Sequence, residues 1–141
     1  MGIQQVSFYS DAADPLHFAC RLIRRALASG KPVGVCVPPA QAARLDQLLW
    51  SFEAAEFIPH RRWDGATRPA PGEVLLVADA ASLPHRGLLL NLGDELPGAA
   101  FEFERVLEVI GTEPERVQAG RVRYRSYKQS GAKLDHFSAA G

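Results

Sequence analysis

The segment RVRYRSYK at 121–128 concentrates groups that bind anions. It holds four cationic side chains and two tyrosines in eight positions, with no carboxylate among them. The whole chain carries 16 basic and 16 acidic side chains, a formal net charge of zero, yet six cations and no acid lie between Arg116 and Lys133. Such a local excess of positive charge predicts a site for an anionic ligand: nucleic acid, a phosphate group or an acidic peptide.

Helical spacing gives this cluster a direction. On a helix, one face carries a set of residues that we call the stripe: Val117, Arg121, Tyr124, Arg125 and Lys128. The neighbouring Arg123 and Tyr127 point elsewhere. The stripe places two guanidinium groups, each able to hold a carboxylate or a phosphate through paired hydrogen bonds, beside an aromatic ring.

The residues alone leave three interpretations of the stripe. The first is a solvated helix face whose charges are offset by preceding acids such as Glu113 and Glu115. The second is direct binding of single-stranded nucleic acid, with Tyr124 and Tyr127 as stacking surfaces. The third is binding of an acidic peptide end. Six cations are few for tight DNA binding, in which phosphate contacts supply much of the affinity.

Motifs for catalysis and nucleotide binding are incomplete. Lys31 in SGKP resembles the lysine of a phosphate-binding loop. In that motif the lysine lies between a strand and a following helix and is followed by Ser or Thr, whereas Lys31 follows a predicted helix, precedes a strand and is followed by proline. Asp79 ends the strand-like LLVAD without a partner loop, and we interpret it as a strand-end turn. The histidines and cysteines lack the spacing of metal ligands. The sequence therefore predicts a binding protein that is not an enzyme and has no cofactor and no metal ion.

A second candidate surface lies in 40–60. The apolar face of AQAARLDQLLWSF runs through its leucines, and Trp50 falls roughly 140° from the middle of that face at the helical period. A tryptophan turned outward and followed by Phe57 predicts an exposed apolar patch for a partner. The alternative is that the loop RRWDG or the next strand folds over Trp50.

The elements that must position these residues alternate between strands and helices. We expect strands at IQQVSFYS, PVGVCVP, EFIPH, EVLLVAD, GLLLNL and about 103–110. Helices are expected over 14–30, with Asp14 as the cap and Pro15 in the first turn, over 39–52, and over 112–129, where TEPE has the form of a capping box. This alternation predicts a single domain over 1–141 with a three-layer α/β fold around a mostly parallel sheet.

Cysteine usage and hydropathy indicate the compartment. Cys20 and Cys36 are the two cysteines of the chain, and both sit in apolar runs, which predicts buried free thiols in a reducing cytoplasm. No apolar run approaches the roughly 20 residues of a membrane span, and MGIQQVSFYS lacks the features of a secretion signal. We expect a cytoplasmic protein without a membrane partner.

Three stretches resemble the chi subunit of the bacterial DNA polymerase III clamp-loader complex. They are SFYS at 7–10, LDQLLWSFEAAEFIPH at 45–60 and RVRYRSYKQSG at 121–131, and the resemblance spans nearly the whole chain. It implies a Rossmann-like fold related to helicase nucleotide domains but lacking working ATPase motifs. It also implies a non-catalytic accessory subunit of the replicative polymerase that meets DNA only indirectly.

The resemblance implies a tail-binding site on the last helix. The family binds the acidic C-terminal tail of single-stranded DNA-binding protein, an Asp-rich segment that ends in Pro-Phe. Carried over by motif, Arg121, Tyr124 and Arg125 match the basic and aromatic positions of this site, and Ile110 matches its apolar wall. Arg116 and Lys128 would attract the aspartates. Arg116 would replace a lysine that the family has where this chain has Val117.

The resemblance also implies a second partner. Members of the family bind the psi subunit, which tethers them to the clamp loader, and Trp50 and Phe57 match the psi-facing surface. In some members a helicase shares this surface, and psi is not recognisable in every bacterium. We therefore expect psi or another helix-bearing partner at Trp50 and Phe57.

Overall fold

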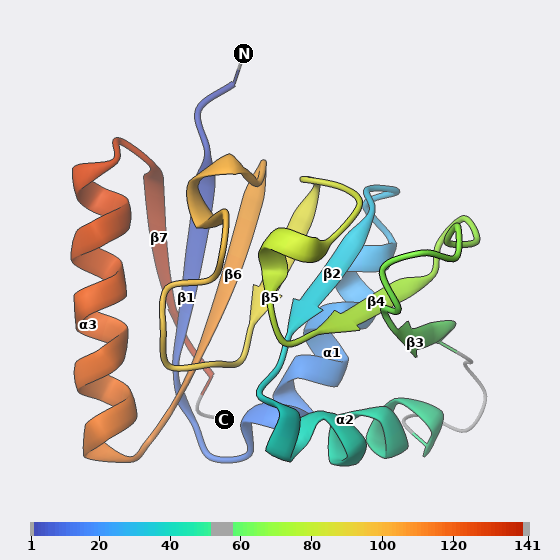
Figure 1. Cartoon of the computed structure of the whole chain (residues 1–141). Helices are drawn as coiled ribbons and strands as arrows, with labels where there is room; N and C mark the ends of the chain where they lie inside the picture. The colour runs from blue at the N-terminus through green and yellow to red at the C-terminus, as the bar shows by residue number, and fades with distance from the viewer. Residues whose placement is uncertain (1, 52–57, 140–141) are drawn as a thin grey trace.

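The computed structural model describes residues 2–51 and 58–139, which form a three-layer α/β fold around a seven-stranded sheet (Figure 1). The strand order is β3-β4-β2-β5-β6-β1-β7, and neighbouring strands pair in parallel. The strands are β1 (Gln5–Ala12), β2 (Val33–Cys36), β3 (His60–Arg62), β4 (Val74–Val77), β5 (Leu88–Asn91), β6 (Arg105–Gly111) and β7 (Lys133–Ser138). The predicted α/β fold with a parallel sheet is confirmed.

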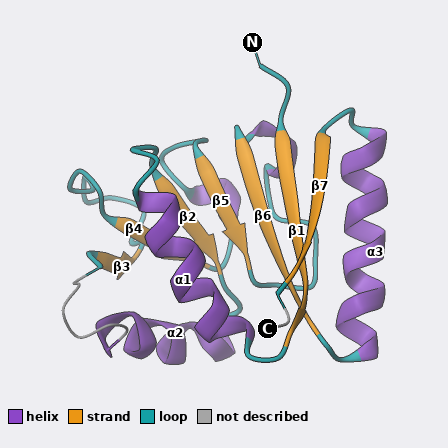
Figure 2. Ribbon diagram, turned by 180° about the vertical axis from the view of Figure 1, so that it is seen from behind, coloured by secondary structure: helices purple, strands orange, loops and turns teal. Residues whose placement is uncertain are grey.

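Helices cover both faces of the sheet. On one face, α1 (Pro15–Leu27) packs against the central strands, as Figure 2 shows, and α2 (Pro39–Ser51) packs beside α1 toward β3. The other face carries α3 (Pro114–Gln129) and two short 3-10 helices, η1 (Ala80–Ser82) and η2 (Ala100–Glu102). Because side chains alternate along a strand, the inner strands β1, β2, β4, β5 and β6 each contribute to two separate apolar clusters, one under each layer. α3 lies over the β6-β1-β7 side of the sheet.

The start of α1 follows the predicted capping pattern, whereas the start of α3 does not. The His17 backbone N–H donates to Asp14 Oδ1 at 3.2 Å, and Pro15 opens the helix. The capping box predicted from Thr112 is wrong: α3 begins at Pro114, and Glu113 occupies the cap position without a side-chain hydrogen bond. Proline fixes the start, because it has no N–H to leave unpaired and its φ is already helical.

Gly120 lets α3 lie close to the sheet. A Cβ atom at this position would stand 2.5 Å from Ile110 Cδ1 on β6. A glycine within a helix costs about 1 kcal/mol relative to alanine, and here the missing methyl group allows the middle of α3 to touch the apolar side chain beneath it. The glycine therefore marks a close helix–sheet contact and does not interrupt the helix.

The edge strand β7 was not predicted. Gly131, with φ of 87°, ends α3 as expected from the sequence. The chain then turns back and pairs in parallel with β1, placing His136 beside Phe8. Most of β7 is exposed and polar, so KLDHFS gives little hydrophobic signal for a strand. This strand supplies a wall of the site described below.

Both cysteines are free and buried, as predicted. Burial raises the pKa of each thiol to about 11, so neither is a reactive thiolate near neutral pH. Within the described ranges, no helix combines the length and the apolar character that crossing a bilayer requires.

Candidate functional site

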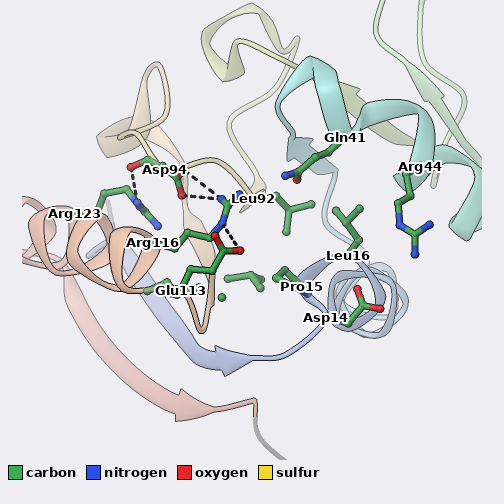
Figure 3. A pocket seen from close by; sticks show the side chains of 13 residues that line it. Asp14, Pro15, Leu16, Gln41, Arg44, Leu92, Asp94, Glu113, Arg116 and Arg123 are labelled. Atoms are coloured by element: carbon green, nitrogen blue, oxygen red, sulfur yellow. Dashed lines mark hydrogen bonds and ion pairs between the residues drawn. The ribbon is translucent and has the colours of Figure 1, made fainter.

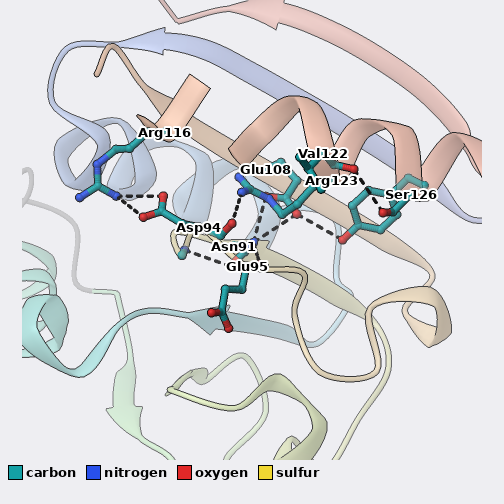
Figure 4. Close-up of polar contacts among 10 residues, drawn as sticks. Asn91, Asp94, Glu95, Glu108, Arg116, Val122, Arg123 and Ser126 are labelled. Atoms are coloured by element: carbon teal, nitrogen blue, oxygen red, sulfur yellow. Dashed lines mark hydrogen bonds and ion pairs between the residues drawn. The ribbon is translucent and has the colours of Figure 1, made fainter. Parts of the chain in front are cut away.

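The inward face of α3 carries a buried polar network. Glu108, in the middle of β6, is 0% exposed, and its carboxylate accepts hydrogen bonds from Arg123 Nε at 3.0 Å, Tyr127 Oη at 3.2 Å and Asn91 Nδ2 at 2.9 Å (Figure 4). Burial raises the pKa of Glu108 to about 7, and the guanidinium of Arg123 opposes that rise. Sequence analysis missed Glu108, because one acid within the apolar run RVLEVIG gives no sign of its partners.

This network fixes the rotation of α3 about its axis. Arg123 Nη1 also donates to the backbone carbonyl of Asp94 at 2.6 Å, which ties the helix to the loop after β5. A buried ion pair is costly to break, because the remaining charge is left without a partner. Arg123 and Tyr127 are held inward, and the helical spacing predicted only that they point away from the stripe. The stripe therefore faces away from the network.

A slot of about 350 Å³ opens on the flank of α3 that meets β1 and β7. It takes its lining from four elements, α3, β1, β6 and β7. The lining residues are Phe8, Ser10, Asp11, Ile110, Val117, Gly120, Arg121, Tyr124 and His136. The structure thus brings Arg121, Tyr124 and Ile110, three of the predicted residues, into one cavity. The side chains from β1 and β7 were missed. His136 lies on the unpredicted edge strand, and the place of Phe8 beside Tyr124 depends on the pairing of β1 with β6 and on the packing of α3.

The slot combines an apolar lining with available positive charge. The Tyr124 ring packs edge-on against Phe8, with centroids 5.2 Å apart, and the residue remains 37% exposed. Arg121, Arg125 and Lys128 are exposed, and none forms an ion pair with a carboxylate in the described part of the chain. The ion pairs therefore do not support the interpretation that preceding acids, such as Glu113 and Glu115, offset the positive charges of the stripe.

Arg116 lies apart from the slot. Its Nη1 is 3.1 Å from Asp94 Oδ1 and its Nε is 3.5 Å from Glu113 Oε1 (Figure 3). At 100° per residue, Arg116 falls on the side of α3 that faces the loop after β5, about a quarter turn from Val117. The structure does not bring it together with Arg121, although the two are close in sequence.

Arg116 lines a second pocket, of about 270 Å³, which lies beyond the carboxyl ends of β1, β5 and β6. Parallel sheets commonly bind nucleotides at this edge. Here Asp14, Asp94 and Glu113 line the pocket together with Arg44, Arg116 and Arg123, and the last two are already paired with carboxylates. The three carboxylates of the lining weaken its attraction for phosphate groups. Lys31 of SGKP precedes β2 at the opposite edge of the sheet and pairs with Glu104 at 3.8 Å. The incomplete phosphate motif thus has no counterpart in this pocket.

Asp79 has the structural role that its sequence context indicated. Its Oδ1 accepts a hydrogen bond from the Ala81 backbone N–H at 3.0 Å, which caps η1 directly after β4. The interpretation of LLVAD as a strand followed by a turn is confirmed.

Trp50 is 59% exposed in the last turn of α2, which confirms the prediction of an outward tryptophan. Its ring meets the buried His60 ring edge-on at 5.0 Å, and His60 Nε2 lies 3.0 Å from Asp46 Oδ1. In the RRWDG segment, Trp63 donates its indole N–H to the Ser82 carbonyl at 2.9 Å, and the contact with the Trp50 ring given above comes from His60 on the next strand, β3. Phe57 lies outside the described residues.

The nucleic-acid interpretation loses one of its two stacking surfaces. Tyr127 is 0% exposed and bonded to Glu108, so the prediction that it stacks on bases is wrong. Tyr124 remains as an aromatic surface on the stripe, and one side of its ring already contacts Phe8. The stripe is therefore better suited to one terminal group entering the slot than to a row of stacked bases.

Comparison with known proteins identifies the relatives of this chain. Residues 3–135 match the family described as DNA polymerase III chi subunit, HolC. The chain is 40% identical over 138 residues to the DNA polymerase III subunit chi of Pseudomonas aeruginosa, covering 94% of this chain and 95% of that protein. It is 31% identical to the corresponding protein of Haemophilus influenzae, over 82% of this chain and 81% of the relative, and 30% identical to that of Escherichia coli, over 82% and 80%.

Proposed function

Because the chain belongs to the DNA polymerase III chi subunit family, we propose that it is a non-catalytic accessory subunit that grips the acidic C-terminal tail of single-stranded DNA-binding protein. The observation that carries this proposal is the slot. Arg121 stands at a partly apolar cavity without a carboxylate partner in the described ranges, beside Tyr124 and Ile110. An acidic chain end with an aromatic last residue supplies both groups that such a cavity favours.

Each part of the ligand has a matching part of the slot. The terminal carboxylate accepts paired hydrogen bonds from the Arg121 guanidinium, and the terminal ring packs among Phe8, Ile110 and Tyr124. A hydrogen bond to a charged group contributes about 1.5–3 kcal/mol when it is shielded from water. Together with burial of one ring, this supports micromolar affinity, about −8 kcal/mol.

A titration of a fluorescent, Asp-rich peptide ending in Pro-Phe tests this function. We expect Arg121→Ala to weaken binding at least tenfold, because the carboxylate loses its fork of donors. Arg68→Ala is the matched control, since it removes an equal charge from an exposed position elsewhere on the surface and is expected to change affinity less than twofold. Equal affinity of wild type and Arg121→Ala would refute the assigned site.

We further propose that the Trp50 surface binds psi or another helix-bearing partner and so links the tail-bound protein to the clamp loader. The exposure of Trp50 and its support by His60 favour this role, because large exposed aromatic side chains anchor interfaces. Trp50→Ala is expected to weaken capture of purified psi at least tenfold, whereas Trp63→Phe, at a tryptophan whose indole N–H donates to the Ser82 carbonyl of η1, is expected to leave it unchanged. Retention of psi by Trp50→Ala would contradict this assignment.

A further inference from the structure

The two ends of the slot differ in charge. Where α3 begins, the wall of the slot includes Asp11, and the nearby Arg116 is already paired with Asp94 and Glu113. Toward the end of α3 the stripe continues with Arg125 and Lys128, which make no ion pair within residues 2–51 and 58–139. An anionic chain that leaves the slot therefore meets repulsion in one direction and attraction in the other.

We propose that the acidic chain end leaves the slot toward the C-terminal end of α3, so that its carboxylates lie over Arg125 and Lys128 and not over Arg116. This inference rests on the proposed function and gives the ligand a direction. Lys128 follows Arg121 by two helical turns, about 10 Å along the axis. An extended peptide covers that distance in about three residues, so acidic groups roughly three positions before the last residue meet Lys128.

At the end of the slot where α3 begins, the Asp11 carboxylate repels acidic groups of a ligand. Ser10 Oγ lies 3.4 Å from Asp11 Oδ2 and 2.7 Å from His136 Nε2, which connects this carboxylate to the wall formed by β7. The positive end of the α3 dipole lies nearby, but Glu113 and Glu115 already occupy that first turn. The fixed charges of this end thus oppose a second set of carboxylates.

Peptide titrations at low salt test the direction in which the peptide leaves the slot, because they show which cations of the protein attract the aspartates of the peptide. We expect the double variant Arg125→Ala/Lys128→Ala to bind the Asp-rich peptide about three- to tenfold more weakly, and Arg116→Ala to bind within twofold of wild type. With a peptide that carries Asn in place of Asp, the loss in the double variant disappears, while the loss caused by Arg121→Ala persists. Coupling of the peptide aspartates to Arg116, and not to the C-terminal cations, would overturn the proposed direction.

Asp11→Asn provides a gain-of-affinity test that a misfolded variant cannot imitate. The Asp11 backbone has φ of 62°, and asparagine tolerates this left-handed conformation as well as aspartate does. Removal of the negative charge is expected to tighten binding of the acidic peptide about two- to fivefold at low salt, with a smaller change for the Asn peptide. Unchanged or weaker binding of the acidic peptide would count against the role of Asp11.

A spin label on the peptide N-terminus reads the direction without reference to affinity. We expect the label to broaden backbone amide signals around 125–131 and to leave those around 11–15 and 113–116 unchanged. The reverse pattern, in a complex that still depends on Arg121, overturns the direction and leaves the proposed function standing. Absence of any peptide binding by wild type overturns both.

Discussion

Arg121 and Arg123 are two positions apart on α3, yet they occupy opposite environments. Arg123 is buried with its guanidinium divided between Glu108 and the Asp94 carbonyl, whereas Arg121 is exposed at the slot without a carboxylate partner in the described chain. The same side chain therefore has a structural role on one face of the helix and an anion-binding role on the other. The buried face sets the orientation of the helix, and the exposed face depends on it.

Breaking the buried pair is expected to have the largest effect. Arg123→Ala leaves the Glu108 carboxylate buried without its cation, which costs about 3–5 kcal/mol of the free energy of unfolding. Urea denaturation measures this loss. Arg121→Ala is the matched control, and a surface change of this kind is expected to stay within about 0.5 kcal/mol. Similar losses for both variants would contradict the division between the two faces.

The pH dependence of the free energy of unfolding shows how the buried Glu108 contributes to stability. Because the pKa of Glu108 rises from 4.5 in the unfolded chain to about 7 in the folded one, the folded state binds its proton more tightly. The stabilisation from this group is complete below the unfolded value and is lost as pH rises through about 7. Denaturation of Glu108→Gln across pH 4–8 is expected to show a flatter profile than wild type between these limits. Parallel profiles would mean that Glu108 does not titrate there.

Gly120→Ala tests the contact that sets the floor of the slot. The new Cβ would overlap Ile110 Cδ1, so α3 or the isoleucine must shift, at a cost of about 1–3 kcal/mol. Replacing a helical glycine by alanine regains about 1 kcal/mol, so we expect a net loss of stability of up to about 2 kcal/mol. The tail peptide is also expected to bind more weakly, because the shift changes the slot. Ala119→Gly, at a neighbouring helical position, is a control for glycine content, with an expected cost of about 1 kcal/mol. A stabilised Gly120→Ala protein with full peptide affinity would contradict the close contact.

The smallest expected effect separates charge from geometry on the exposed face. Arg121→Lys keeps the positive charge but loses the planar fork, so we expect about a three- to tenfold loss of tail-peptide affinity and almost no change in stability. The same exchange at Arg125, outside the slot lining, is expected to cost less than twofold. If Lys restores full affinity at 121, the carboxylate is held by charge alone.

Periodic patterns were enough to predict the main elements and the two faces of α3. The separation of Arg123 and Tyr127 from the stripe and the outward direction of Trp50 follow from spacing along single helices, and the alternation of strands with helices predicted the parallel sheet. These features depend on local sequence, because a helix repeats every 3.6 residues whatever it packs against.

Contacts between distant segments could not be predicted in the same way. Glu108 needed the pairing of β6 with β5 before Asn91 could be seen beside it, and the slot needed β7, whose exposed residues have no apolar alternation. Arg116 was assigned to the tail site by its closeness in sequence to Val117, but its side chain turns toward Asp94 on another loop.

A chemical-shift map of the isotopically labelled protein, with the Asp-rich peptide added stepwise, tests the central claim most directly. We expect the largest changes at the slot, at the amides and side chains of Phe8, Arg121 and Tyr124, with a midpoint in the micromolar range. Changes centred on the Arg116 pocket or on Trp50, with the slot signals unmoved, would contradict the account.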